Sequence, residues 1–200
     1  MISTRGGALE LDIVEKAKNI EISRRGFLKS AALAVAGAGM MPTELLAAKK
    51  TEKEIKLFNV HERKLYRAEF YENDCYKISG LMTIDRALID FRAKEIARID
   101  VNLINLLYDI NRYVGMDKHF NVLSGYRSPR TNAYLRHHSE GVAKHSYHTK
   151  GQAIDINVPG VPLRKLRDIA IALGRGGVGY YPRSNFIHVD VGPVRTWRRG

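Results

Sequence analysis

Apolar and polar residues come close to alternating from Glu54 to Tyr71, on either side of the polar stretch "HERK". Successive side chains of a strand point to opposite faces of a sheet, so this alternation is typical of strands with one buried face. A short polar stretch between two such segments favours a tight connection. The pattern therefore predicts a β-hairpin.

Two helices are expected after the hairpin. Between Ile84 and Ile99, apolar residues recur three and four positions apart among charged ones, which favours an amphipathic helix. The following segment begins at Asp100, a residue type that often caps helix N-termini, and reaches Gly115, which can end a helix. We expect both helices to cover one face of a sheet.

The second half of the chain mixes strand and helix patterns. Strands are predicted over 120–123, 153–158 and 186–191, and helices after Pro129 and over 162–174. The glycine-rich segment 174–185 is expected to form a loop, and the basic end around Trp197 a solvated tail. The order predicts an α+β fold: a single domain with a central, mainly antiparallel sheet, helices packed on one face, and the polar His and Asp positions on strands.

The first fifty residues carry a targeting pattern. Ser23, Arg24, Arg25, Gly26, Phe27, Leu28 and Lys29 precede about a dozen small apolar residues, and the run resembles a twin-arginine export signal. Residues 30–41 are too few to span a bilayer core, which needs roughly 20 apolar residues, so no stable membrane span is expected after cleavage. We expect a signal peptide over 1–48, a domain over 49–200 and a periplasmic or secreted protein exported by the twin-arginine machinery. An amphipathic N-terminal helix is the alternative.

The formal net charge is +12, and the first 48 residues hold six basic against five acidic side chains, so about +11 belongs to the rest. Such a surface favours a polyanion, which can be nucleic acid, anionic lipid or an anionic wall polymer. Cys75 is the single cysteine, which rules out an intrachain disulfide and leaves an inert thiol as the simplest expectation.

The stretch "SYHTKGQAID" places His148 and Asp155 seven positions apart, and His188 lies on another predicted strand. Zinc sites of hydrolases use three nitrogen and oxygen ligands and leave one position for water, and His/His/Asp is such a set. Strand alternation puts Asp190 on the same face as His188. A single His and Asp pair is by itself weak evidence, because a histidine on a strand is more often a hydrogen-bonded structural residue.

A resemblance strengthens the metal interpretation. Ser146, His148, Gly151, Ala153 and Asp155 match the S-x-H-x-x-G-x-A-x-D signature of the zinc D-Ala-D-Ala peptidase superfamily, which includes lysostaphin-type and VanX-type enzymes. Together with "SGYRS" and "GGVGYYPRSNFIHVD", the chain is similar over residues 55–198 to the exported murein endopeptidase K group.

The resemblance implies one Zn²⁺ held by His148, Asp155 and His188, with Arg127 near the substrate carbonyl or carboxylate. It implies attack of a metal-bound water on an amide bond of peptidoglycan. Ser146 belongs to the expected substrate-binding side of the site. Tyr126 and Tyr147 are candidates to line a groove for the polymer, although tyrosines equally seal the rim of a small core.

One position departs from the family. VanX-type members carry a glutamate base three residues before the last histidine, where this chain has Asn185. Asp190 is the nearest carboxylate on the right face, and we expect it to act either as general base or as the partner that orients a ligating histidine.

The sequence thus predicts a zinc-dependent murein endopeptidase or carboxypeptidase, monomeric and without a nucleic-acid partner. A wall-binding module that keeps the fold but does no chemistry is the alternative, and Asn185 keeps it open. The bond that is cut stays open among D-Ala to diaminopimelate, diaminopimelate to diaminopimelate and a terminal D-Ala.

Overall fold

The predicted hairpin is confirmed by the computed structural model, which describes residues 51–139 and 142–200. Strand β1 covers Lys53–Asn59, strand β2 covers Lys64–Glu72, and the two pair antiparallel. Every second residue is buried, as the alternation requires: Ile55 and Leu57 on β1, and Tyr66, Ala68 and Phe70 on β2. The expected export signal lies outside the described residues.

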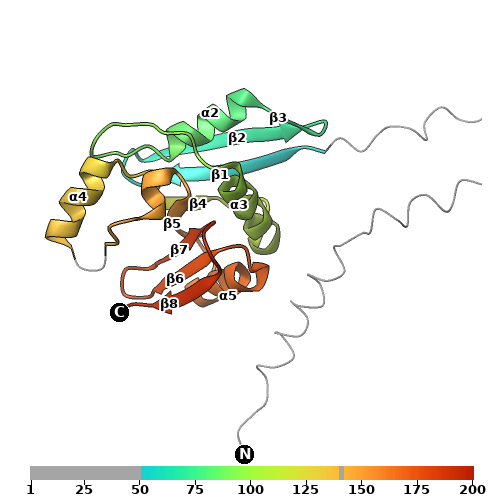
Figure 1. Cartoon of the computed structure of the whole chain (residues 1–200). Helices are drawn as coiled ribbons and strands as arrows, with labels where there is room; N and C mark the ends of the chain where they lie inside the picture. Colours follow the sequence, from blue (N-terminus) through green and yellow to red (C-terminus); the bar gives the residue numbers. More distant parts are fainter. Residues whose placement is uncertain (1–50, 140–141) are drawn as a thin grey trace, which may run out of the picture. The chain divides into compact units, whose positions relative to one another are not determined.

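The described residues form one eight-stranded sheet in the order β3-β2-β1-β4-β5-β7-β6-β8 (Figure 1). The other strands are β3 Cys75–Tyr76, β4 Phe120–Ser124, β5 Ala153–Asn157, β6 Gly177–Tyr181, β7 Phe186–Asp190 and β8 Arg195–Arg198. Five of the seven strand pairings are antiparallel, and β1–β4 and β6–β8 are parallel. The sheet is therefore mainly antiparallel, and the α+β class is confirmed.

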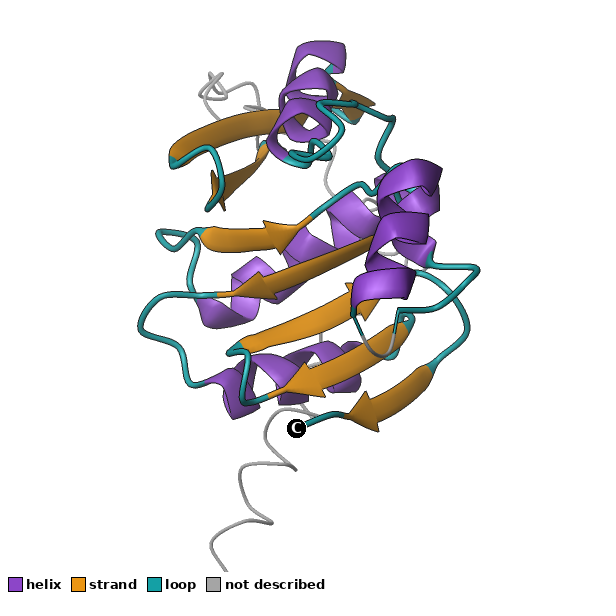
Figure 2. Cartoon of the chain, turned by 90° about the vertical axis from the view of Figure 1, so that its left-hand side faces the viewer, coloured by secondary structure: helices purple, strands orange, loops and turns teal. Residues whose placement is uncertain are grey.

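The helices are α2 Ile78–Ala87, α3 Val101–Val114, α4 Pro129–His138, α5 Leu163–Leu173 and the short 3-10 helix η2 Tyr147–Lys150. As expected, α3 starts at the Asp100 cap, whose carboxylate accepts from the backbone N–H of Asn102, and ends at Gly115. Helices α3 and α5 pack on each other and on the sheet, and Figure 2 shows helices behind the strands. Across the described ranges, no helix is both long and apolar enough to cross a membrane.

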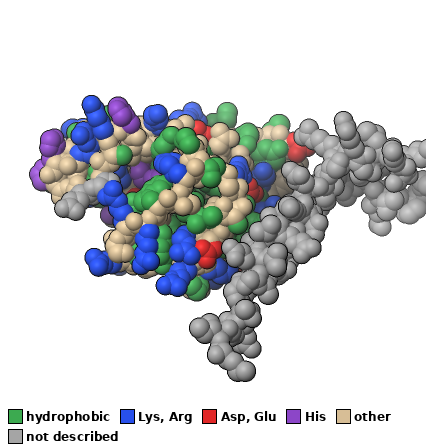
Figure 3. Space-filling view, turned by 60° about the horizontal axis from the view of Figure 1, so that its bottom comes forward, with side chains coloured by type: hydrophobic (Ala, Val, Ile, Leu, Met, Phe, Trp, Pro, Cys, Tyr) green, Lys and Arg blue, Asp and Glu red, His purple; other side chains and the backbone are tan. Residues whose placement is uncertain are grey.

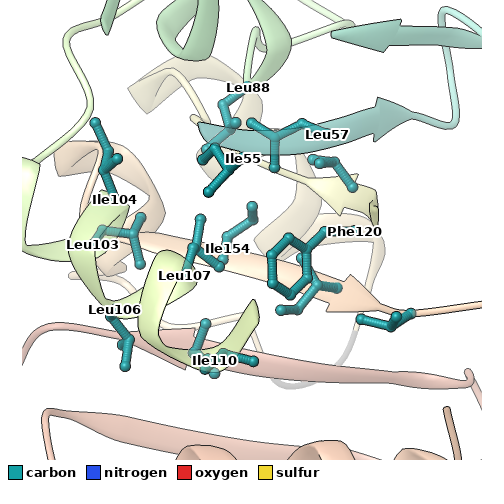
Figure 4. Packing of buried hydrophobic residues seen from close by; sticks show 14 of the residues in the cluster. Ile55, Leu57, Leu88, Leu103, Ile104, Leu106, Leu107, Ile110, Phe120 and Ile154 are labelled. Carbon is teal, nitrogen blue, oxygen red and sulfur yellow. The ribbon is translucent and has the colours of Figure 1, made fainter. Parts of the chain in front are cut away.

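The two faces of the central strands carry different kinds of side chain. On one face, Phe120, Ile154, Ile156, Ile187 and Val189 belong to the hydrophobic core, together with apolar residues of α3. Figure 4 shows Phe120 and Ile154 with Leu103, Leu107 and Ile110 of α3. Because side chains alternate along a strand, the residues between those of the core point to the other face. On β5 and β7 these are Asp155, His188 and Asp190. The pleat thus separates an apolar core from a polar face.

The helix predicted over 84–99 is wrong beyond Ala87, where α2 ends. The chain then forms a loop held by two buried carboxylates. Asp85 accepts from the backbone N–H of Ile99 at 2.9 Å, and Asp90 accepts from those of Arg92 and Ala93 at 3.0 and 3.2 Å. The two Asp90 bonds are local and compete with helical hydrogen bonds. The apolar residues that are spaced like a helix face belong to a loop. This loop buries Leu88 and Ile99 in the core.

Two further expectations are corrected at the C-terminal end. The middle of the segment expected as a glycine-rich loop is strand β6. The expected solvated tail contains strand β8, which pairs with β6 in parallel. Glycine is unfavourable in a strand unless another group must approach closely. An added Cβ at Gly179 would lie 2.5 Å from an atom of the Trp197 ring, so here the glycine makes room for β8.

Replacing Asp90 with Ala is expected to lower the free energy of unfolding by about 2–3 kcal/mol, because the buried N–H group of Ser128 and the partly buried ones of Arg92 and Ala93 lose their acceptor. Equilibrium urea unfolding measures this. Replacing the exposed Asp168 with Ala is the control and should change stability by less than about 0.5 kcal/mol. Equal effects at both positions would show that the Asp90 bonds contribute no special stability.

Candidate metal centre

His148 lies in η2, on a turn built by the residues of the signature. The Ser146 hydroxyl accepts from the backbone N–H of His148 at 3.3 Å and caps the short helix. Gly151 ends it with φ of +66°, and a Cβ there would lie 2.4 Å from the carbonyl oxygen of Arg98, so only glycine fits. The signature therefore encodes the turn that presents His148. Ser146 is buried, and its described contacts are those of a cap.

Asp155 and His188 come from neighbouring strands. In the antiparallel pairing of β5 and β7 they are directly opposite each other, on the face away from the core. The Cβ atoms of directly opposite residues are about 4.5–5.5 Å apart, so their side chains can contact each other. Asp155 Oδ1 lies 2.9 Å from His188 Nδ1.

The three expected ligands converge. His148 Nε2 lies 3.2 Å from His188 Nδ1 and 3.4 Å from Asp155 Oδ1. One ligand atom from each residue thus forms a tight triangle, and this group could hold a metal ion. A tetrahedral zinc with bonds of about 2.0–2.1 Å separates its ligand atoms by about 3.3–3.4 Å. The triangle is close to that size, so the residues fit Zn²⁺.

The remaining ring nitrogens also have partners. His148 Nδ1 lies 2.8 Å from the carbonyl oxygen of Gly125, to which it can only donate. His188 Nε2 lies 2.9 Å from Asp190 Oδ2. Metal-binding histidines usually donate their second N–H to a carbonyl or carboxylate, which fixes the ring and leaves the other nitrogen for the ion. Both histidines have this arrangement.

The charges suit a cation. Burial alone would raise the pKa of Asp155, but the nearby His148 and His188 outweigh it and hold that pKa far below its usual range. Burial lowers the pKa of His148. Burial opposes a charge on His188 as well, yet the hydrogen bonds to Asp155 and Asp190 raise its pKa to about 9. Without metal, a proton on His188 Nδ1 therefore bridges to Asp155 at neutral pH.

The triangle opens into a hollow of about 280 Å³. Its lining consists of Arg127, Val142, Ala143, His145, Ser146, Tyr147, His148, Asp155, Tyr181, Phe186, His188, Arg195 and Trp197. Of the candidate groove residues, Tyr147 lines the hollow, whereas Tyr126 packs against the core and lines a smaller adjacent space. His137 and His138 are exposed and lie in the last turn of α4.

Arg127 stands beside the triangle, in the turn between β4 and α4. Its Nη2 lies 3.9 Å from Asp155 Oδ2, and its guanidinium also donates to Ser124 and Asn132. The backbone N–H of Arg127 donates to the carbonyl oxygen of His148 at 3.1 Å, which ties this turn to the ligand turn. Although the side chain is 12% exposed, it still reaches the hollow. This places a fixed cation at the hollow, beside the triangle.

Asp190 is fully buried behind His188 and is absent from the lining of the hollow. Its carboxylate accepts from His188, from both terminal nitrogens of Arg195, and from the backbone N–H groups of Gly177 and Gly192. Of the two roles expected for Asp190, these contacts favour orientation of the ligating histidine. Asn185 is exposed, in a turn with φ of +54°, and supplies no carboxylate.

Several residues that line the hollow were not predicted as site residues, among them His145, Arg195 and Trp197. Arg195 and Trp197, both on β8, line the hollow, and the Trp197 ring lies 5.3 Å from that of His188. The sequence contained one indication of this: Arg195 and Trp197 are two positions apart, and residues at that spacing lie on the same face of a strand. The tail was not recognised as a strand because three basic residues surround the single tryptophan.

Fold and site together define an α+β domain with a His/His/Asp triangle of the zinc D-Ala-D-Ala peptidase type. A family profile described as peptidoglycan L,D-endopeptidase MepK matches residues 47–197. The chain belongs to this family, and the resemblance found in the sequence is confirmed.

Curated relatives agree with the profile. The chain is 41% identical over 179 residues to the peptidoglycan L,D-endopeptidase MepK of Escherichia coli strain K12, covering 88% of this chain and 98% of the relative. It is 39% identical over 182 residues to the probable peptidoglycan L,D-endopeptidase MepK of Haemophilus influenzae, covering 90% and 97%. No solved structure matches the chain significantly.

Binding of Zn²⁺ to the metal-free protein is expected to release about one proton at pH 7, because the ion replaces the proton on His188 Nδ1. The affinity should rise about tenfold per pH unit and level off near pH 9. Titration calorimetry in buffers of different ionisation enthalpy measures both quantities. The variant His148→Ala should lose most of the binding; tight binding by that variant would place the ion elsewhere.

Proposed function

We propose that this protein is a zinc-dependent endopeptidase that hydrolyses amide bonds in the peptides of peptidoglycan. The observation that carries the proposal is the triangle of His148, Asp155 and His188, open to a hollow, in a chain of this family. The curated relatives are named as peptidoglycan endopeptidases. A binding-only module would not need an open metal site, so we favour the enzyme.

His148 Nε2, His188 Nδ1 and Asp155 Oδ1 would hold the ion. Bound there, Zn²⁺ supplies a Lewis acid that polarises a carbonyl and lowers the pKa of water to about 7. Asp190 keeps the His188 ring in place with its Nδ1 toward the triangle. We assign Asp190 this orienting role, because its carboxylate is enclosed by five donors and does not reach the hollow.

Arg127 supports substrate binding and charge stabilisation in this proposal. Its guanidinium is held by Ser124 and Asn132, so it is positioned before substrate arrives. A preorganised cation stabilises the negative charge that develops on a carbonyl oxygen during attack. Tyr147, Tyr181 and Trp197 add aromatic surface beside it, suited to the apolar parts of a peptide.

Proton transfer needs a side chain that faces the hollow. Because Asp190 is enclosed and Asn185 cannot accept a proton, we assign this role to His145. It is exposed, it lines the hollow, and it is not one of the three ligands. Imidazole is the side chain that most readily exchanges protons near neutral pH.

The name of the curated relatives also narrows the choice of the amide bond that is cut. An endopeptidase cuts within a chain, which disfavours removal of a terminal D-Ala, and L,D names a bond between an L and a D centre. The link between two diaminopimelates joins such centres. We therefore propose this link as the substrate, with the basic surface drawing the enzyme to the anionic polymer. In Figure 3, Lys and Arg side chains clearly outnumber acidic ones on the face shown.

Purified protein is expected to digest peptidoglycan sacculi with Zn²⁺ and to lose the activity after chelation, because hydrolysis depends on the ion. Mass spectrometry of the released fragments should show that the bond between two diaminopimelates has been hydrolysed. Digestion that is equally fast after chelation would remove the zinc peptidase proposal. Binding to sacculi with no digestion by metal-loaded native protein would instead favour the wall-binding module.

The same assay tests the proton-transfer role. His145→Ala should lower the rate by about 10²- to 10⁴-fold, the usual contribution of a general base. His137→Ala is the matched control, since this exposed histidine lies outside the hollow, and its rate should equal that of the native protein. An unchanged rate in His145→Ala would assign proton transfer to another group.

We also propose export by the twin-arginine route, supported by Ser23 to Lys29 in the sequence. In a bacterial host with this route, replacing Arg24 and Arg25 by Lys should leave the full chain in the cytoplasm, because the export machinery recognises the paired arginines. Cell fractionation and immunodetection measure this. Arg5→Lys is the control in the same leader. Export of the double variant would mean that another signal acts.

A further inference from the structure

Strand β8 brings a cation to the back of the metal centre. Arg195 Nη1 lies 3.0 Å from Asp190 Oδ1, and Arg195 Nη2 lies 2.7 Å from Asp190 Oδ2. The pair is therefore bidentate, the arrangement that gives an arginine and carboxylate both strength and a defined geometry. Asp190 Oδ2 in turn bonds His188 Nε2 at 2.9 Å. A continuous chain of polar contacts joins Arg195 to the expected metal ligand.

Two glycines on β6 allow the side chains of β8 to extend across β6. Gly177 is paired with Arg195 and Gly179 with Trp197 across the parallel β6–β8 ladder. A Cβ at Gly177 would lie 2.4 Å from Arg195 Nη1 and 2.6 Å from Asp190 Oδ2. A Cβ at Gly179 would lie 2.5 Å from the Trp197 ring. Since Gly177 and Gly179 have no side chains, the β8 side chains can extend over β6 to residues of β7.

Aromatic rings hold the guanidinium in place. The Arg195 guanidinium carbon lies 5.2 Å from the centroid of the Tyr147 ring and 5.1 Å from that of Trp197. Trp197 is itself fixed by a hydrogen bond from its indole N–H to the Tyr181 hydroxyl at 2.9 Å. These contacts hold an otherwise flexible, 40% exposed side chain in one position.

We propose that Arg195 is a positioning residue for the metal centre: through Asp190 it fixes the ring of His188 for metal binding. The inference rests on the proposed function, because it takes the three residues to be zinc ligands. A buried carboxylate with a bidentate cation behind it has one orientation, and its oxygen Oδ2 then has a fixed place for the His188 N–H. Without Arg195, Asp190 keeps only the two backbone donors and His188, and the ring is less restrained.

The test compares Arg195→Met and Arg195→Lys with the native mature protein, measuring Zn²⁺ affinity by competition with a chromophoric chelator. Loss of such a supporting partner typically weakens metal affinity by about 10- to 100-fold. We expect a loss in that range for Arg195→Met. For Arg195→Lys we expect a smaller loss, because lysine keeps the charge but not the bidentate fork.

Arg198→Met is the matched control. Arg198 lies on the same strand, but alternation directs it to the opposite face, where its guanidinium lies over Tyr180. Its Zn²⁺ affinity should equal that of the native protein. Co²⁺ provides a second readout, since its visible absorption reports ligand geometry. The Co²⁺ spectrum should change in Arg195→Met and not in Arg198→Met.

The outcomes separate the two proposals. Failure of the native protein to bind Zn²⁺ would remove the proposed function. Native binding together with unchanged Zn²⁺ affinity and Co²⁺ spectrum in Arg195→Met would overturn the positioning role alone. If Arg195→Met does not fold, Arg195→Lys decides: a native spectrum and affinity in this folded variant would equally overturn the role of the bidentate pair.

Discussion

The cross-strand pair of Asp155 and His188 is the contact on which the site depends. Both side chains point away from the core because Ile154, Ile156, Ile187 and Val189 point into it. A slip of one residue between β5 and β7 would turn the ligands into the core and the apolar residues outward. The burial of these four aliphatic side chains therefore sets the register that brings the carboxylate opposite the imidazole.

The third residue of the triangle, His148, is positioned in a different way. His148 comes from a 3-10 turn, where the Ser146 cap and the left-handed Gly151 determine its direction, and the carbonyl of Gly125 fixes its ring. That carbonyl belongs to the turn that also carries Arg127. This turn rests on the loop that follows α2: Tyr126 donates its backbone N–H to Leu88, and Ser128 to Asp90. The loop after α2 therefore supports the turn that holds the His148 ring, although it contributes no residue to the triangle.

Polar groups around the triangle are almost fully paired. Each histidine nitrogen and both oxygens of Asp190 have partners within hydrogen-bond distance. In a site of low dielectric, such a network restricts its members to one arrangement, because an unpaired buried polar group costs about 1–3 kcal/mol. The protein thus fixes the geometry of the site through its own contacts, and aromatic and cationic side chains border the open side.

The sequence by itself determined the hairpin, the capped helix α3, the strands that carry Asp155 and His188, and the identity of the three converging residues. Those features are local, since alternation, capping residues and a short signature act over a few positions. Tertiary structure alone decided the rest. Asp85 and Asp90 use backbone groups distant in the chain to replace a helix by a loop, which no spacing of apolar residues reveals. Likewise, only the packing of Arg195 over Gly177 shows that Asp190 is enclosed, because the burial of a carboxylate depends on a strand added from the other edge of the sheet.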